Sequence, residues 1–499
     1  MDQSIVSRAG ALRRSAAHPN SHSGGWADAQ HDRYKWTQPC DCLLSTRSDT
    51  RPAMNAGSPS PSATVADLVS DRVESLADDD LVNRLQRAAF DYFDRYTNRL
   101  NGLVADTSRP DSPCSIAVVG FALAAYVIAV TRGWLSRDEA VTRTLTTLRF
   151  FAGSEQSVSP AATGYQGLYY HFLDLHSGRR VWNCELSLID TALLIAGVLV
   201  VGRFFDGEGA EAEIRTLSAD LYRRVDWRWA QNNSTTLSQG WKPECGFLHY
   251  GWEGYNEATL IYVLGLGSPT YPLSDSSLRT WTMTYQWECV LGTEFLYSGP
   301  LFTHLFSHAW IDYRGIRDQF MREKQCDYFE NTRRAIAVQR AYAERNPRGF
   351  PGYGRDLWGI SAGDGPIETG PRSQLRVNRY LGYTARGVPY GPDDGTLSPW
   401  AMLATLPFEP EAALAGTRNV LRTFPRACPE NRFSSGFNAA LATPAGCWLS
   451  EGWYGLDQGL LVLLIENARS DLVWSLLRAS PAVRTGLANA GFSGGWLSP

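Results

Sequence analysis

Residues 185–205 read ELSLIDTALLIAGVLVVGRFF, an apolar stretch with one carboxylate, Asp190, inside it. A helix that is apolar on every side is buried, whereas the following segment, 211–229, is amphipathic with its charges on one side. Buried and amphipathic helical segments continue to alternate along most of the chain. This alternation predicts an all-α fold in which an outer ring of helices surrounds an inner ring.

Long connections rich in Gly and Pro separate several of these helices, at 154–182, 346–397 and 425–455. Unstructured connections of this length are uncommon unless they carry function, and these occur on alternate links. We therefore expect them to gather at one end of a barrel. Few segments resemble a β-strand; the best of them is 167–174, GLYYHFLD, where we expect one arm of a short β-hairpin.

Composition excludes several classes of protein. The 499 residues carry a formal net charge of −4, which does not resemble the basic surface of a nucleic-acid-binding protein. The longest apolar run, 117–130, is too short for a membrane span, and no secretory signal is recognisable. Residues 1–62 lack a hydrophobic period and predict a disordered tail, which leaves 63–499 as a single catalytic domain.

The nine cysteines are scattered, so neither a disulfide scaffold nor a zinc site is expected. His304, His308 and Asp312 follow one another at intervals of four residues, which would place them on one face of a helix. That spacing suits metal ligands, but it equally suits groups that bind sugar hydroxyls or polar groups satisfied in the core. No other His or Cys pattern supports a metal.

Residues 240–264, GWKPECGFLHYGWEGYNEATLIYVL, combine six aromatic residues with the carboxylates of Glu244, Glu253 and Glu257. Aromatic faces beside acidic groups suit a sugar, because rings stack on its C–H faces and carboxylates bind hydroxyls or transfer protons. Glu257 lies at the start of an apolar helix. It is either a group that helps the helix begin or a general acid whose pKa is raised by burial.

Further carboxylates occupy comparable positions. Asp190 is costly inside an apolar helix unless an arginine neutralises it or it faces a polar cleft. Asp457, in WYGLDQGLL, begins a helix after an aromatic loop; it is either a helix cap or a partner that faces Glu257 across a cavity. Asp364 and Asp394 lie in Asp-Gly turns. No phosphate loop, nucleophile-elbow serine or dinucleotide fingerprint is present.

Seven segments together resemble the bacterial glucoamylase-like domain family, which includes endo-β-1,2-glucanases and related β-1,2-glucan transglycosylases. The resemblance extends from about Asp79 to Phe492 and leaves out residues 1–62. Thr259 and Tyr271 depart from the family pattern, which puts chain-length preference in doubt more than the reaction. The segments are ELSLIDTALLIAG, GWKPECGFLHYGWEGYNEATLIYVLGLGSPTYPL, GPLFTHLFSHAWIDYRGI, YFENTRRAIAVQRAYAERNP, YGRDLWGISAGDGP, DDGTLSPWAMLATLPFEPE and YGLDQGLLVLLIENARSDLVW.

The resemblance implies an (α/α)6 barrel that cleaves linear β-1,2-glucan internally to short sophorooligosaccharides, with no metal or cofactor. It assigns the general acid to Glu257 and the base to Asp457, which can act through a substrate hydroxyl. It also implies that Asp190 binds the sugar. We expect the remaining sugar contacts among ten residues of the same segments and loops: Glu185, Glu244, Trp252, Tyr255, His308, Asp312, Arg314, Asp364, Asp394 and Trp453.

An inverting reaction requires the two carboxyl groups to lie roughly 6.5–9.5 Å apart, whereas a separation of about 5 Å favours a retaining transglycosylase. A glucan-binding protein that has lost catalysis is a further alternative, against which the presence of Glu257, Asp190 and Asp457 argues. We expect a monomer whose partner is the glucan. The substrate suggests the periplasm, although several relatives have a signal peptide and none is recognised here.

Overall fold

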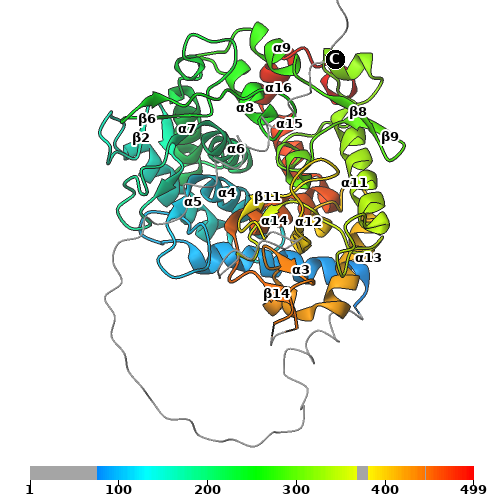
Figure 1. Cartoon of the computed structure of the whole chain (residues 1–499). Coiled ribbons are helices and arrows are strands. Elements are labelled where there is room, and N and C mark those ends of the chain that lie inside the picture. The colour runs from blue at the N-terminus through cyan, green and yellow to red at the C-terminus, as the bar shows by residue number, and fades with distance from the viewer. Residues whose placement is uncertain (1–75, 368–379, 444–445, 499) are drawn as a thin grey trace, which may run out of the picture.

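The computed structural model describes residues 76–367, 380–443 and 446–498 (Figure 1). The predicted tail, 1–62, lies outside these residues. Helices arranged in two concentric rings dominate the described part of the chain, which confirms the predicted (α/α)6 barrel. None of the helices in this part is long and apolar enough to cross a membrane.

The inner ring consists of helices that are buried on nearly every side. They are α4 (Ile116–Thr131), α6 (Leu188–Phe204), α8 (Thr259–Leu266), α12 (Pro399–Leu403) and α14 (Gly455–Ser470). Two 3₁₀ turns, η2 (Leu301–His304) and η3 (Ser307–Ala309), stand in the ring between α8 and α12. Glycines let α4 and α6 pack closely, since a Cβ at Gly120 would lie 2.2 Å from the carbonyl oxygen of Leu193.

The outer helices are amphipathic, as their charge patterns predict. They are α3 (Asp78–Tyr96), α5 (Arg137–Gly153), α7 (Ala210–Arg224), α11 (Tyr328–Arg345) and α13 (Pro410–Thr423), with α16 (Pro481–Asn489) packed on α8. Helix α5 has an N-terminal cap, because the Ser136 hydroxyl accepts a hydrogen bond of 3.2 Å from the Glu139 amide. Shorter helices complete the described chain: α9 (Ser276–Thr282), α10 (Gln319–Glu323) and α15 (Leu472–Arg478).

The order of the inner helices decides which residues face one another. Helix α4 packs on α6 and on α14, α6 packs on α8, and α12 packs on α14. With η2 and η3 between α8 and α12, α8 and α14 occupy opposite positions in a ring of six. Residues at the starts of these two helices therefore face one another across the mouth of the barrel.

Short antiparallel sheets gather where the inner helices begin. A five-stranded sheet joins β2 (Gly164–Tyr165), β3 (Leu168–Tyr170), β5 (Leu186–Ser187), β6 (Gly240–Lys242) and β7 (Gly246–Phe247). Strands β2 and β3 form a hairpin, which confirms the predicted arm over 168–170 only, because the strand ends before His171 and the chain continues as β4 in another sheet. Strand β1 (Cys114–Ser115) pairs with β4 (Phe172–Leu173). Because β1 leads directly into α4 and β5 into α6, these sheets mark the end of the barrel at which the functional loops lie.

The later long connections contribute further small sheets. They contain β10 (Ala362–Gly363) paired with β11 (Thr384–Ala385), and a three-stranded sheet of β12 (Thr396–Leu397), β13 (Phe437–Asn438) and β14 (Trp448–Leu449). Strand β12 ends one residue before α12. The hairpin of β8 (Trp287–Val290) and β9 (Thr293–Leu296) packs on α11. The loops that we expected at one end are thus tied together by short strands.

The helical spacing predicted for His304, His308 and Asp312 is wrong. The segment forms the two turns η2 and η3 instead of one helix, so intervals of four residues do not place these side chains on a common face. Among the described residues there is also no group of three or more His, Cys, Asp or Glu side chains that could hold a metal ion.

Candidate active site

Four carboxylates form the electrostatic centre at the mouth of the barrel. Asp190 and Asp457 lie in the first turns of the inner helices α6 and α14. Asp106 comes from the loop before α4, and Asp364 from the loop before α12. Helix N-termini carry partial positive charge, which stabilises the two buried aspartates at the starts of these helices.

Asp190 is held by a serine and a histidine. The Ser187 hydroxyl hydrogen-bonds to Asp190 Oδ2, and it accepts a hydrogen bond of 3.2 Å from the Asp190 amide. His171 Nε2 lies 3.5 Å from Asp190 Oδ2, and His171 Nδ1 lies 3.1 Å from Glu185 Oε1. The sequence left open whether an arginine neutralises Asp190. In the structure the cationic neighbour of Asp190 is His171.

Burial and neighbouring charges together determine the pKa values of His171 and Glu185. Burial alone would lower the pKa of His171, but Asp190, Glu185 and Asp106 raise it to about 9. Burial would raise the pKa of Glu185, yet the hydrogen bond and charge of His171 lower it to about 2. His171 is therefore an imidazolium between two carboxylates at neutral pH.

This charge state predicts that part of the protein's stability disappears at alkaline pH. The ordinary pKa of histidine is 6.5, and that of His171 in the folded protein is about 9. Between these values only the folded state holds the proton. The free energy of unfolding should thus fall as pH rises through this interval, by up to about 3 kcal/mol, whereas the contribution is fully present below pH 6.5.

Urea unfolding of the wild type and of His171→Asn at pH 6 and pH 9.5 measures this effect. The difference in stability between the two proteins should be larger at pH 6. An equal difference at both pH values would show that His171 is not protonated in the folded state.

The pKa values of Asp106 and Asp457 are both raised, mainly by burial, and neighbouring charges shift them further. Burial raises the pKa of Asp106 to about 6, with His171 lowering it and Asp190 raising it. Burial also raises the pKa of Asp457 well above its ordinary value; a hydrogen bond with Ser435 opposes this, and the charges of Asp106 and Asp364 add to it. Asp457 Oδ2 is fully buried and has no hydrogen-bond partner in the described structure. A carboxyl group in this setting has a strong affinity for a proton.

Asp364 connects this cluster to the outer loops. Its Oδ2 atom forms an ion pair with Arg109 and accepts a hydrogen bond of 3.1 Å from the Ser450 hydroxyl. The Arg109 guanidinium lies over the ring of Tyr454, 5.3 Å from its centroid. Asp364, which the sequence predicted to lie in an Asp-Gly turn, therefore belongs to the site and lies close to the start of α14.

Glu257 lies on the opposite side of the mouth, two residues before α8. The residue is 4% exposed, and its carbonyl oxygen accepts a hydrogen bond of 2.9 Å from the Ser307 hydroxyl. Asn256 Oδ1 accepts a hydrogen bond of 2.9 Å from the Ala258 amide. Asn256 thus satisfies the turn that begins the helix.

Three of the expected sugar-binding residues lie in the core. Trp252 is 2% exposed, and its carbonyl oxygen accepts a hydrogen bond from Tyr262. Tyr255 packs against the rings of Tyr285, His304 and Tyr328. His308 Nε2 contacts the Tyr328 carbonyl and the Thr332 hydroxyl, and burial lowers the His308 pKa to about 3. The described contacts of these side chains are those of core residues.

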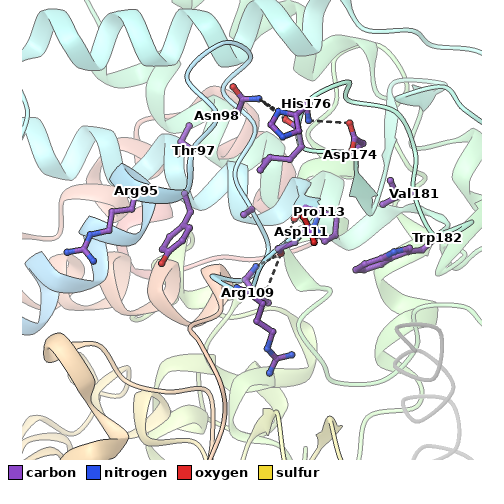
Figure 2. Close-up of a pocket in the computed structure, with 15 residues that line it drawn as sticks. Arg95, Thr97, Asn98, Arg109, Asp111, Pro113, Asp174, His176, Val181 and Trp182 are labelled. Atoms are coloured by element: carbon purple, nitrogen blue, oxygen red, sulfur yellow. Dashed lines mark hydrogen bonds between the residues drawn. The ribbon is translucent and has the colours of Figure 1, made fainter. Parts of the chain in front are cut away.

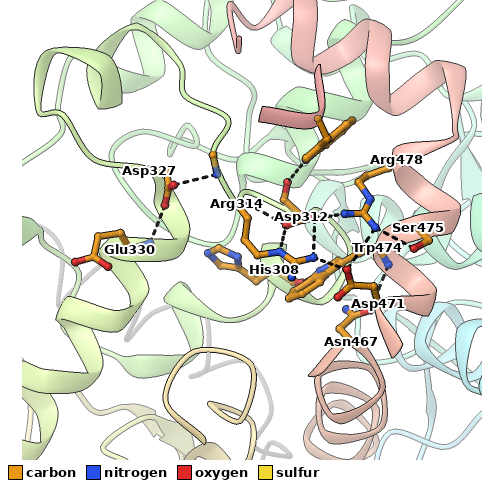
Figure 3. Close-up of polar contacts among 12 residues, drawn as sticks. His308, Asp312, Arg314, Asp327, Glu330, Asn467, Asp471, Trp474, Ser475 and Arg478 are labelled. Carbon is orange, nitrogen blue, oxygen red and sulfur yellow. Dashed lines mark hydrogen bonds and ion pairs between the residues drawn. The ribbon is translucent and has the colours of Figure 1, made fainter. Parts of the chain in front are cut away.

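Asp312 and Arg314 form a network of ion pairs next to the C-terminal end of α14 (Figure 3). Asp312 forms ion pairs with Arg314 and Arg478, at 2.8 and 2.6 Å. Arg314 also pairs at 2.7 Å with Asp471, the residue that ends α14. Asp457 and Asp471 are fourteen residues apart on one helix, which corresponds to about 20 Å. The structure therefore does not bring Asp312 and Arg314 together with the carboxylates at the mouth.

The other expected residues lie in the loops at the mouth but have structural partners. Glu244 pairs at 2.6 Å with the buried Arg180. Asp394 pairs at 2.6 Å with Arg386, and both side chains are buried. Trp453 packs under the Arg432 guanidinium, 4.2 Å from its ring centroid. These contacts hold the loops around the site.

Three residues of the site were missed from the sequence: Asp106, Arg109 and His171. Asp106 and Arg109 belong to ADTSRPDS, which has the composition of a turn. His171 lies within the predicted strand GLYYHFLD, where an ionisable residue among apolar neighbours is a usable signal for a buried polar contact. Only the pairing of β1 with β4 and of β3 with β5 shows that His171 lies beside Glu185 and Asp190.

Comparison with known proteins agrees with this architecture. A family model described as "Putative glucoamylase" matches residues 249–481. An exo β-1,2-glucooligosaccharide sophorohydrolase (non-reducing end) of Parabacteroides distasonis is 26% identical over 457 residues, which are 84% of this chain. The match spans 59% of that enzyme's length.

Solved structures show the same fold. A glucoamylase-like protein from Bacteroides uniformis superposes with a TM-score of 0.75 at 26% identity, over 85% of this chain and all of the other. An endo-β-1,2-glucanase from Chitinophaga pinensis, solved with sophorotriose and glucose, gives a TM-score of 0.72 at 23% identity, over 85% of this chain and all of the other. Residues 249–481 are therefore similar to the glucoamylase-like domain, and the chain has the (α/α)6 barrel fold that is also found in enzymes acting on β-1,2-glucans.

Proposed function

We propose that the protein is a glycoside hydrolase that cleaves linear β-1,2-glucan internally and releases short sophorooligosaccharides. The observation that carries this proposal is the placement of Glu257 and Asp457 at the starts of α8 and α14, on opposite sides of a mouth lined with further carboxylates. The P. distasonis sophorohydrolase supports the linkage type of the substrate.

In the proposed reaction, Glu257 donates its proton to the glycosidic oxygen as the bond from the anomeric carbon to that oxygen breaks. A water molecule forms the new bond to the anomeric carbon, and its proton passes to Asp457 directly or through a substrate hydroxyl. An inverting reaction requires the two carboxyl groups to lie far enough apart to leave room for that water. The raised pKa of Asp457 makes its ionised form a stronger base.

The remaining ionised groups suit the binding of a sugar. Asp190 and Glu185 accept hydrogen bonds from hydroxyl groups, and His171 fixes the positions of both. Asp364 is fixed by Arg109 and Ser450 on the side of Asp457. A polyhydroxylated ligand can therefore be oriented between the two proposed catalytic carboxyl groups.

Incubation with linear β-1,2-glucan, followed by thin-layer chromatography of early and late samples, tests the proposal. We expect a ladder of short sophorooligosaccharides and a rapid loss of polymer length. Sophorose as the sole early product would identify an exo-acting enzyme like the P. distasonis relative. Longer or cyclic chains would identify a transglycosylase, and an unchanged polymer would leave glucan binding without catalysis.

A further inference from the structure

A pocket of about 540 Å³ lies beside the carboxylates (Figure 2). Its walls come from the end of α3, from the loop before α4, and from the loop between β4 and β5. None of the residues assigned above to acid or base catalysis lines it. The pocket is large enough for an organic ligand of several rings.

One segment of the chain separates the pocket from the carboxylates. Val104, Ala105 and Thr107 form β-bridges with Thr97, Cys114 and Tyr454, and the chain bends at Asp106 between them. Ala105 and Thr107 line the pocket, whereas Asp106 does not line it and interacts electrostatically with His171 and Asp190. The pocket and the candidate active site thus lie back to back.

Trp182 gives the pocket an exposed aromatic wall. Its side chain lies at the edge of the pocket, and the residue is 53% exposed (Figure 2). Trp182 and Asn183 have φ angles of 58° and 50°, in the left-handed region that bulky residues rarely adopt. An unfavourable backbone that holds a large apolar ring in solvent points to a binding role for that ring.

The ring of Trp182 is also supported from behind. It contacts the ring of Phe172 at 5.1 Å between centroids, and Phe172 stacks on His171 at 3.9 Å. His171 is the residue that pairs with Glu185 and Asp190. A chain of ring contacts, tilted between Trp182 and Phe172 and stacked between Phe172 and His171, therefore runs from the pocket to the candidate active site and fixes the position of Trp182 relative to the carboxylates.

The charges around the pocket favour a neutral ligand. Two arginines and two aspartates line it, which balances its formal charge. Arg95 pairs at 2.9 Å with Glu430, Arg109 pairs with Asp364, and Asp174 Oδ1 accepts hydrogen bonds of 2.7 Å from the amide and the hydroxyl of Ser177. Polar groups beside one exposed aromatic face match a carbohydrate, which offers hydroxyls at its rim and C–H groups on its faces.

We propose that this pocket is a second glucan-binding site, in which Trp182 stacks on a pyranose of the polymer at a distance from the bond that is cleaved. The proposal rests on the proposed function for the identity of the glucan. A polymer can occupy the pocket and the active site together, which raises its local concentration at the carboxylates. A short oligosaccharide occupies only one of the two sites at a time.

Kinetics with Trp182→Ala test the second site. We expect KM for linear β-1,2-glucan to rise about tenfold, because a stacking contact is lost, and kcat for the polymer to stay within about twofold. The kcat/KM for sophorotriose should change by less than about twofold. Trp182→Phe keeps an aromatic face and should restore most of the polymer KM. Leu100→Ala is the matched control, because Leu100 is 91% exposed on a neighbouring turn outside the pocket lining.

Equal losses on polymer and sophorotriose would overturn the proposal, and so would an unchanged polymer KM in Trp182→Ala. Calorimetric titration of the Asp457→Asn protein with sophoropentaose adds a measurement independent of turnover. Two binding events should be seen, and adding Trp182→Ala should remove one of them. If the wild type does not cleave β-1,2-glucan, the proposed function fails. The pocket is then judged by whether Trp182→Ala weakens the binding of any neutral glucan.

Discussion

Asp457→Asn should lower kcat on linear β-1,2-glucan by a factor of about 10³, with the fold intact. The amide is close to the carboxyl group in size and can still hydrogen-bond with Ser435, but it cannot accept a proton from water. Steady-state rates of reducing-end release measure the loss. Asp138→Asn is the matched control, because Asp138 occupies the first turn of the outer helix α5 and is exposed, so the rate should not change.

The pKa of Asp457 also predicts the shape of the pH profile. A base must be ionised, so kcat/KM of the wild type should fall as pH falls through the raised pKa of this carboxyl group. Asp457→Ala leaves space for a small anion, and added azide should restore turnover and yield a glycosyl azide of inverted configuration. If azide does not rescue the variant and the loss instead depends on the leaving group, Asp457 is the acid and the base lies elsewhere in the cluster.

Glu257→Gln should lower kcat on the polymer by a factor of about 10³ to 10⁴, because the glycosidic oxygen then leaves without a proton. A substrate whose leaving group needs no proton should escape most of this loss. We therefore expect 2,4-dinitrophenyl β-sophoroside to be cleaved at a rate within about tenfold of the wild type. Release of the phenolate, followed by its absorbance, measures this rate.

Glu253→Gln is the matched control for Glu257→Gln. Glu253 lies four residues earlier in the same aromatic segment, but its side chain is exposed. Its replacement should leave the polymer rate within about twofold of the wild type. Near-normal polymer turnover by Glu257→Gln would remove Glu257 from the role of acid. An equal loss on the polymer and on the activated substrate would show that Glu257 positions the sugar and does not transfer a proton.

The sequence by itself determined the two rings of helices. A helix such as 188–204 is apolar on every side and can only be buried, whereas 210–224 has one apolar face and must cover it. The same local signals placed Glu257 and Asp457 at or near the starts of inner helices, because helix entrances have short-range signatures. Asp190 was predicted inside its helix, and the structure places it in the first turn of α6. One arm of the hairpin, over 168–170, was likewise visible as a local pattern within 167–174.

Only the tertiary structure decided which polar groups belong to the site. His171 meets Asp190 because β1, β3, β4 and β5 pair across the long loop at the mouth, a contact that no local pattern contains. Asp312 and Arg314 lie in a segment of the family resemblance, yet the chain places them near the end of α14 that is about 20 Å from Asp457.

The reason for this division is physical. Periodicity and helix caps depend on neighbours within one or two turns, so they can be read along the chain. The pKa values of Asp106, His171 and Asp457 depend on burial and on charges that residues distant in sequence bring within a few ångströms. The sequence therefore determined the barrel and its acidic helix entrances, and the packing of the loops decided which of those acids share a site and which of them keep their protons.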